Sequence, residues 1–174
     1  MRLSLLLAAL ALPFAAPVGA ALAPGAKAPD FRTQGALNGK VFNLTLSDQL
    51  TNGPVVLYFF PAAFTPGCNA EAKAFADATA QFKAAGATVI GMSADPVNRL
   101  VAFSTEHCAG KFAVASAGPK VVSGYDVALA GRKMTSRTSY VIARDGRIVY
   151  AHDDPSPAGH ITGTLAAVKK LARS

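Results

Sequence analysis

The fold is decided by residues 55–86, which read VVLYFFPAAFTPGCNAEAKAFADATAQFKAAG. The continuous apolar run from Val55 to Phe60 is typical of a β-strand that is buried on both faces. A helix is expected from about Pro66 to Ala85, because Thr65 followed by proline is a helix start signal. The helix should stop at Gly86, because glycine readily adopts the left-handed conformation that ends helices. A buried strand leading into a long helix indicates an α/β domain.

The rest of the chain continues this alternation of strand and helix. An Asn38-Gly39 turn precedes one strand, and Asp145-Gly146 joins two others as a hairpin. The segment Val121 to Leu129 fits neither period. The order predicts a three-layer α/β domain with a central mixed sheet flanked by helices, an order that the thioredoxin fold also has. Strands are expected at Val41–Leu46, Ala87–Met92, Phe112–Ala115, Ser139–Ala143 and Arg147–His152, and helices from Asp95-Pro96 to near Gly110 and from about Gly159 to Leu171.

Length and composition exclude several classes of protein. The 174 residues suit one ordinary domain, and 51% hydrophobic against 16% charged residues argues against disorder. The formal charge of +7 is scattered rather than clustered, so nucleic-acid binding has little support. Two cysteines can make neither a disulfide-dense scaffold nor a four-cysteine zinc site.

Residues 1–20 have the pattern of a secretory signal peptide, which leaves residues 21–174 as the folded domain. Arg2 is followed by a Leu/Ala-rich stretch and then by small residues ending at Ala20. Cleavage after Ala20 is preferred to cleavage after Ala23, which would place Pro24 directly after the cut. An uncleaved membrane anchor is the alternative, but prolines and a glycine break the stretch. The pattern predicts a periplasmic or otherwise secreted protein without stable membrane association, in a compartment where cysteines can form disulfides.

The chemistry of the chain is expected around Cys68. If Thr65 caps the helix and Pro66 is its first residue, Cys68 is the third helical residue. Its sulfur should then lie near the Thr65 hydroxyl and the free N–H groups of the first turn, which favour thiolate over thiol. Cys68, Phe75 and Phe82 are seven apart, so the sulfur should face the sheet. The alternative is a cysteine that is simply a small buried apolar residue.

Other thiol chemistries fit less well. The absence of a Cys-x-x-Cys pair weakens a dithiol oxidoreductase. A cysteine hydrolase would need a histidine base, and His107, His152 and His160 all lack a local signature. Metal binding has too few soft ligands. Direct attack of a thiolate on an electrophile that needs no general base is the chemistry that remains.

Pro61 to Cys68, PAAFTPGC, resembles the PxxxTxxC active-site signature of the peroxiredoxins. Glu71-Ala72 matches the family's continuation, although Asn69 replaces a common threonine. Residues 137–142, RTSYVI, resemble the segment that carries the family's active-site arginine, and residues 28–31 and 91–95 match as well. The resemblance spans residues 21–174 and is nearest to the bacterioferritin-comigratory, or Q-type, group.

The resemblance implies a thioredoxin-like fold and a thiol peroxidase without metal or organic cofactor. Cys68 would attack a peroxide and become a sulfenic acid, and Thr65 would hydrogen-bond the sulfur and the peroxide. Arg137 would stabilise the thiolate and the polarised O–O bond, and Pro61 would wall the pocket. Glu71 would orient Arg137 rather than touch peroxide, or else belong to a solvated helix face.

The second cysteine leaves three hypotheses open. Many Q-type members carry a resolving cysteine five residues after the first, where this chain has Lys73, and some carry one in the second helix. In that second helix Asp95 is expected to be the cap and Pro96 the first residue, so Cys108 is expected in the last turn before Gly110. It would resolve Cys68 within one chain, be a bystander in a one-cysteine enzyme, or form a permanent bridge to Cys68.

The main prediction is therefore a thiol-dependent peroxidase that reduces hydrogen peroxide or organic hydroperoxides. A thioredoxin-like protein or another thiol would serve as its reductant, and the protein would be a monomer or weak homodimer. The alternatives are a periplasmic thiol–disulfide oxidoreductase of thioredoxin fold and a non-enzymatic secreted domain with a structural disulfide.

Overall fold

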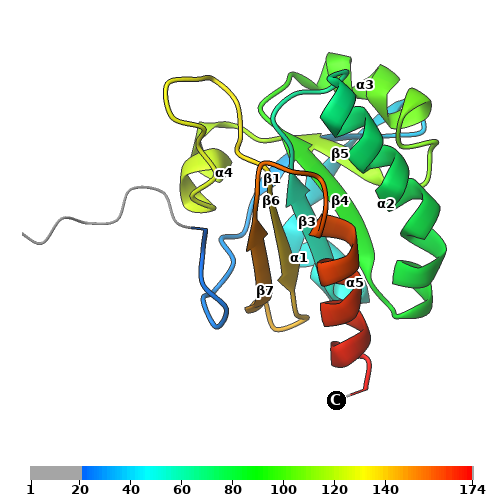
Figure 1. The fold of residues 1–174 in the computed structure, drawn as a ribbon, viewed down its shortest axis with the longest axis vertical. Coiled ribbons are helices and arrows are strands. Elements are labelled where there is room, and N and C mark those ends of the chain that lie inside the picture. Colours follow the sequence, from blue (N-terminus) through cyan, green and yellow to red (C-terminus); the bar gives the residue numbers. More distant parts are fainter. Residues whose placement is uncertain (1–20, 174) are drawn as a thin grey trace, which may run out of the picture.

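Residues 21–173 are described by a computed structural model, and the predicted signal peptide, residues 1–20, lies outside them. Strands and helices alternate along the described chain except at two hairpins, β1–β2 and β6–β7 (Figure 1). The strands are β1 (Arg32–Leu37), β2 (Lys40–Thr45), β3 (Val55–Phe59), β4 (Thr88–Ser93), β5 (Ala113–Ser116), β6 (Thr138–Ile142) and β7 (Ile148–Asp153). The helices are α1 (Leu46–Asn52), α2 (Pro66–Ala84), α3 (Val97–Glu106), α4 (Pro119–Gly124) and α5 (His160–Leu171).

The strands form one mixed sheet, as predicted. Its order is β2-β1-β5-β4-β3-β6-β7. Strand β4 pairs parallel with β3 and with β5, while β6 and β7 continue the sheet antiparallel beyond β3. The carboxyl ends of β3, β4 and β5 therefore meet at one edge of the sheet, where α2 and α3 begin.

Helices cover both faces of the sheet, which explains the apolar run in the sequence. Every residue of β3 is buried. Val56 and Tyr58 join the core under α2, α3 and α5, whereas Val55, Leu57 and Phe59 join the core under α1 and α4. Figure 1 shows α2 and α5 side by side on one face, with α4 on the other side of the strands.

Helix α2 presents the predicted face to the sheet. Cys68, Phe75 and Phe82 are each at most 1% exposed. The helix stops two residues before Gly86, whose φ of +76° lies in the left-handed region that glycine adopts without strain. The buried position of the Cys68 side chain thus follows from the seven-residue spacing.

Sequence analysis did not predict strand β1 or the short helix α1, both near the start of the domain. Strand β1 (RTQGAL) is largely polar, and its outer neighbour β2 completes a hairpin at Asn38-Gly39, with φ of 47° and 77°. The predicted strand Val41–Leu46 lies at Lys40–Thr45, because Leu46 begins α1 and is buried with Leu50. The undecided segment from Val121 is partly helical, in α4.

Two predictions about the second helix are wrong. Pro96, not Asp95, is the N-cap residue of α3, and no side chain caps that helix. The helix ends at Glu106, so Cys108 lies two residues beyond it rather than in its last turn. Ala109 and Gly110 both take positive φ, 50° and 63°, so the backbone after Cys108 cannot continue the helix.

Candidate active site

Cys68 lies in the first turn of α2, which follows the loop after β3, at the sheet edge where the parallel strands end. It is the third residue of α2, and it is 1% exposed. The first intrahelical hydrogen bond runs from the Asn69 N–H to the Thr65 carbonyl oxygen at 2.8 Å. The thiol is therefore held at the positive end of a 19-residue helix.

Thr65 is the N-cap residue by backbone geometry, but its side chain does not cap the helix. Its φ and ψ of −94° and 147° are extended, as an N-cap residue requires. Its hydroxyl donates instead to the Ala62 carbonyl oxygen at 3.0 Å. The expectation of a side-chain cap is wrong, because the hydroxyl is directed back to Ala62 and its oxygen accepts no N–H of the first helical turn.

The Arg137 guanidinium reaches Cys68 from the residue just before β6. Its Nη2 lies 3.6 Å from the Cys68 Sγ, and its Nε donates to the Pro155 carbonyl oxygen at 2.9 Å. Its Nη1 donates to the Glu71 Oε2. A side chain at Gly67 would meet Nη2 at 3.3 Å, so the glycine leaves room for this approach. Arg137 is 7% exposed, and all three of its nitrogens have partners.

Glu71 sits one turn after Cys68 and contacts Arg137, as the sequence led us to expect. It is fully buried rather than on a solvated face. Burial raises the pKa of the Glu71 carboxyl from 4.5 to about 7, and the neighbouring Arg137 charge opposes that rise. Of its two carboxylate oxygens, Oε2 accepts a hydrogen bond from Arg137, whereas Oε1 is buried without a hydrogen-bond partner.

A strained loop, residues 60–65, joins β3 to Cys68. Phe64 has a φ of +63°, which is unusual for a bulky residue. The loop backbone is tied to the start of α3: the Ala63 N–H donates to Asp95 Oδ2 at 2.7 Å, and Arg99 donates to the Ala63 carbonyl oxygen at 2.9 Å. Asp95 therefore binds the active-site loop instead of capping α3. Sequence reasoning gave no role to Arg99 or Phe64.

Pro61 and Cys108 are placed less directly. Pro61 is half-buried and follows Phe60, whose carbonyl oxygen accepts from the Thr135 hydroxyl at 2.7 Å. Cys108 is fully buried in the same apolar core as Cys68, and both cysteines are free thiols. Burial raises the pKa of the Cys108 thiol to about 12, so it stays protonated in this fold.

These contacts make an electrophile-attacking thiol chemically reasonable. A helix N-terminus and a fixed guanidinium both favour negative charge on sulfur. The same guanidinium can donate to an oxygen held beside the sulfur. The Glu71 carboxyl, one helical turn after Cys68, faces Arg137 and is closed off from solvent.

Comparison with known proteins identifies the family. Residues 24–151 match the AhpC/TSA family. The chain belongs to this family, that of the peroxiredoxins. It is 35% identical over 166 residues to the chloroplastic peroxiredoxin Q of Suaeda salsa, covering 91% of this chain and 73% of that protein. The chloroplastic peroxiredoxin Q of Oryza sativa subsp. japonica is 33% identical over 150 residues, covering 84% and 67%.

Solved structures agree with the fold. Peroxidoxin BcpB from Mycobacterium tuberculosis superposes with a TM-score of 0.75 at 30% identity, over 85% of this chain and 97% of that one. The thioredoxin-like peroxiredoxin fold is thus confirmed, and the chain is a thiol-dependent peroxidase. These relatives do not favour a dithiol oxidoreductase or a non-enzymatic scaffold.

The predicted periplasmic or secreted location is wrong. Similar peroxiredoxins are chloroplastic, and others come from a mycobacterium, so a periplasmic address has no support. A Leu/Ala-rich stretch reports hydrophobicity and does not by itself specify a compartment. The prediction that residues 1–20 are a leader concerns residues that the structure does not describe.

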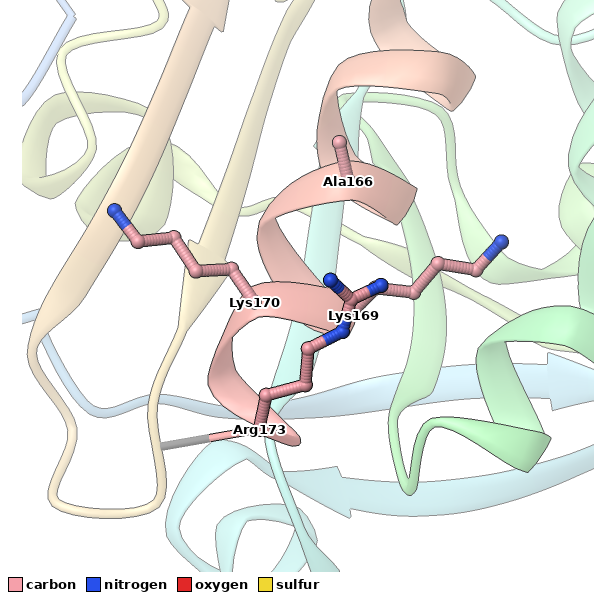
Figure 2. Close-up of a pocket in the computed structure, with 4 residues that line it drawn as sticks. All are labelled: Ala166, Lys169, Lys170 and Arg173. Carbon is pink, nitrogen blue, oxygen red and sulfur yellow. The ribbon is translucent and has the colours of Figure 1, made fainter.

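Metal-ligating clusters and membrane-spanning helices are absent from residues 21–173. Within this range no cluster of His, Cys, Asp and Glu could hold a metal ion, and no helix is long and apolar enough to cross a membrane. A surface depression on α5 is lined by Ala166, Lys169, Lys170 and Arg173 (Figure 2). Figure 2 shows Lys169 and Lys170 extending to opposite sides of the helix, so their charges do not converge.

Proposed function

We propose that Cys68 is the peroxidatic cysteine of this peroxiredoxin. Its thiolate attacks one oxygen of a peroxide, so that an S–O bond forms while the O–O bond breaks. Sulfur is oxidised to sulfenic acid, and the leaving hydroxide or alkoxide takes up a proton to leave as water or alcohol. Hydrogen peroxide and organic hydroperoxides are the proposed substrates, with no metal or organic cofactor.

The position of the Arg137 guanidinium beside the Cys68 sulfur is the main support for this proposal. The guanidinium lies 3.6 Å from the Cys68 sulfur and is anchored on its other nitrogens by Glu71 and Pro155. A donor that is fixed before the reaction stabilises developing charge without reorganising. We propose that Arg137 stabilises both the thiolate and the peroxide oxygens, and that Glu71 orients it.

Thr65 and Pro61 have supporting roles in this proposal. The Thr65 hydroxyl would leave the Ala62 carbonyl oxygen, to which it now donates at 3.0 Å, and bind a peroxide oxygen. A rotation about χ1 is enough to redirect a threonine hydroxyl. Pro61, which begins the loop after Phe60, would limit the access of water to the sulfur.

Regeneration needs a second thiol. We propose that Cys108 resolves the Cys68 sulfenic acid within one chain, giving a disulfide and water, and that a thioredoxin-like or other thiol then reduces the disulfide. The free thiols in this structure argue against a permanent bridge. The alternative is a one-cysteine cycle in which the external thiol attacks the sulfenic acid directly.

We also propose that the catalytic domain comprises residues 21–174 and acts as a monomer or weak homodimer. Within the described residues, the exposed large apolar side chains are Leu37, Val41 and Val149. The first two lie in the β1–β2 hairpin and the third in β7, at opposite edges of the sheet. They form no continuous apolar patch of the size that stable dimers bury.

One experiment tests the site. Reduced protein is treated with one equivalent of hydrogen peroxide in the presence of dimedone, and the modified cysteine is identified by mass spectrometry. We expect label at Cys68, none at position 68 in Cys68→Ser, and a rate at least roughly 10-fold lower in Arg137→Lys, which keeps the charge but loses the planar fork. Unchanged oxidation in Arg137→Lys, or turnover by natively folded Cys68→Ser, would contradict the proposal.

A further inference from the structure

His160 is a buried polar residue beside the Arg137–Glu71 pair, and the proposed mechanism leaves it unused. It is the first residue of α5 and is fully buried. As one of three histidines without a local motif, it carried no signal in the sequence. Its surroundings in the fold, however, lead back to Arg137 and Glu71.

Hydrogen bonds fix the proton on the His160 ring. Its Nε2 lies 3.0 Å from the Asp154 carbonyl oxygen, which can only accept, so Nε2 carries the hydrogen. Its Nδ1 lies 2.8 Å from the Ser139 hydroxyl and accepts from it. Burial lowers the pKa of His160 and outweighs the hydrogen bond to Asp154, which raises it, while the nearby His152 and Arg137 lower it further. The ring is therefore neutral, with a lone pair on Nδ1.

Both ends of the ring are tied to elements that hold Arg137. Asp154, whose carbonyl oxygen accepts from His160, precedes Pro155, whose carbonyl oxygen accepts from the Arg137 Nε at 2.9 Å. The Asp154 N–H also donates to the Arg137 carbonyl oxygen, at 3.3 Å. Ser139 follows Arg137 by two residues and so lies on the same side of the chain. His160 thus fixes the turn on which the guanidinium is anchored.

The unprotonated Nδ1 also lies near Glu71. The distance from Nδ1 to Glu71 Oε1 is 3.9 Å, and Oε1 is the carboxylate oxygen without a hydrogen-bond partner. Because Nδ1 carries no hydrogen and its lone pair is engaged by Ser139, the ring donates nothing to Oε1 and does not stabilise the carboxylate charge. Glu71 is paired with Arg137, just before β6, and lies near His160 of α5, while Cys68 is one turn back on its own helix. The Tyr58 hydroxyl of β3 interacts electrostatically with Glu71, and the His152 ring of β7 lies edge-on to His160 at a centroid distance of 4.5 Å.

We propose that His160 is a positioning residue of the peroxidase site, which fixes the Arg137 anchor through Asp154 and sets the protonation of Glu71 through Nδ1. The inference rests on the proposed function of Cys68 and Arg137. It adds a histidine that touches neither peroxide nor sulfur to the groups that control the rate. Loss of the Glu71 charge would leave Arg137 without the partner that orients it, so the rate of peroxide reduction should fall as Glu71 is protonated.

The test is a set of variants followed from pH 5 to pH 8.5. The second-order rate of Cys68 oxidation by hydrogen peroxide is measured for the full chain by rapid quench with dimedone and mass spectrometry. His160→Phe removes both hydrogen bonds, His160→Gln keeps a donor for Asp154 but no lone pair at the Nδ1 position, and Ser139→Ala frees the Nδ1 lone pair to face Glu71. Lys170→Gln, an exposed change on the same helix, is the matched control.

The expected shifts have opposite signs. At pH 8, His160→Phe should be roughly 10-fold slower than the wild type, because Arg137 loses its anchor. In His160→Gln the acid limb of the profile should move to lower pH, and in Ser139→Ala to higher pH, because a proton is then shared more readily between Nδ1 and Glu71. A merely structural histidine would change thermal stability without these opposed shifts.

The outcomes separate the two proposals. If wild-type Cys68 is not oxidised by peroxide, the proposed function fails. If Cys68 is oxidised, and His160→Gln and Ser139→Ala keep the profile of Lys170→Gln, the role of His160 is overturned. If circular dichroism shows that His160→Phe does not fold, the other two variants still decide.

Discussion

At the scale of single residues, the active site pairs a guanidinium, Arg137, with a carboxyl group, Glu71, whose charge is opposed by burial. Arg137 bonds through all three of its nitrogens, whereas Glu71 is buried deeply enough that burial opposes its charge. Their ion pair therefore does not offset the burial of Glu71 completely. Such a pair is better understood as a positioning device than as a source of stability.

The first prediction concerns the pH dependence of stability. The pKa of Glu71 is raised in the folded protein to about 7, above its value of 4.5 in an unfolded chain. The stabilising contribution of protonated Glu71 is then complete below about pH 4.5 and is lost as the pH rises through about 7. Relative to Glu71→Gln, which cannot ionise, the wild type should lose on the order of 3 kcal/mol of unfolding free energy between pH 4.5 and pH 8.

Urea unfolding of both proteins at several pH values measures this difference. Asp77→Asn is the matched control, because it removes an exposed carboxylate from the same helix. Its difference from the wild type should stay within about 1 kcal/mol, as for other exposed ion pairs. A constant difference between wild type and Glu71→Gln at all pH values would show that burial does not penalise the Glu71 charge.

At the scale of elements, the site is a joint between the start of α2 and the length of α3. Phe64, with its positive φ, packs edge-on against Phe103 and His107 at ring-centroid distances of 5.4 and 5.5 Å. The Arg99 guanidinium lies 5.7 Å from the centre of the same ring. Helix α3 thus holds the strained loop before Cys68, and its end leads directly to Cys108. Local unfolding of the loop before Cys68 should therefore also weaken the packing of the segment that carries Cys108.

The second prediction concerns Cys108→Ser. Cys108 is buried and stays protonated, so it can attack the Cys68 sulfenic acid only after local opening. We expect the variant to retain the first oxidation, to accumulate sulfenic acid, to over-oxidise more readily and to lose turnover with a disulfide-specific reductant.

Peptide mapping of peroxide-treated wild type provides the complementary measurement. It should yield a Cys68–Cys108 disulfide within one chain. If Cys108 can still be alkylated after Cys68 is fully oxidised, the one-cysteine cycle takes the place of the two-cysteine one.

At the scale of the whole molecule, local signals in the sequence were sufficient for the architecture but not for every contact. The apolar run of β3 and the Thr65-Pro66 start of α2 placed Cys68 correctly, because both are governed by neighbouring residues. Asp95 looked like a helix cap, yet it binds Ala63, which is 32 residues away in the sequence. His160 and Ser139 gave no signal, because their partners depend on how α5 packs on the sheet. Contacts of this kind are set by tertiary structure, which the pattern of one chain does not encode locally.

The third prediction is that oxidation opens one edge of the molecule and leaves the sheet intact. The cross-link would close a loop of about 40 residues, which in the chain-entropy model stabilises by about 4 kcal/mol. Forming the disulfide also separates Cys68 from Arg137 and exposes the buried surroundings of both cysteines, which destabilises the protein. Because the two effects on stability oppose each other, the melting temperature is a poor measure of the local opening. Hydrogen exchange resolves the two effects because it reports each segment separately.

In the oxidised protein we expect faster exchange in residues 60–70 and 104–112, where the loop, the first turn of α2 and the end of α3 lie. Strands β3, β4 and β6 should keep their protection, because both of their faces remain covered by helices. The double variant Cys68→Ser with Cys108→Ser should show no peroxide-dependent change. Loss of protection across β3 and β4 would mean that the disulfide requires global unfolding, which would be too rare an event to sustain turnover.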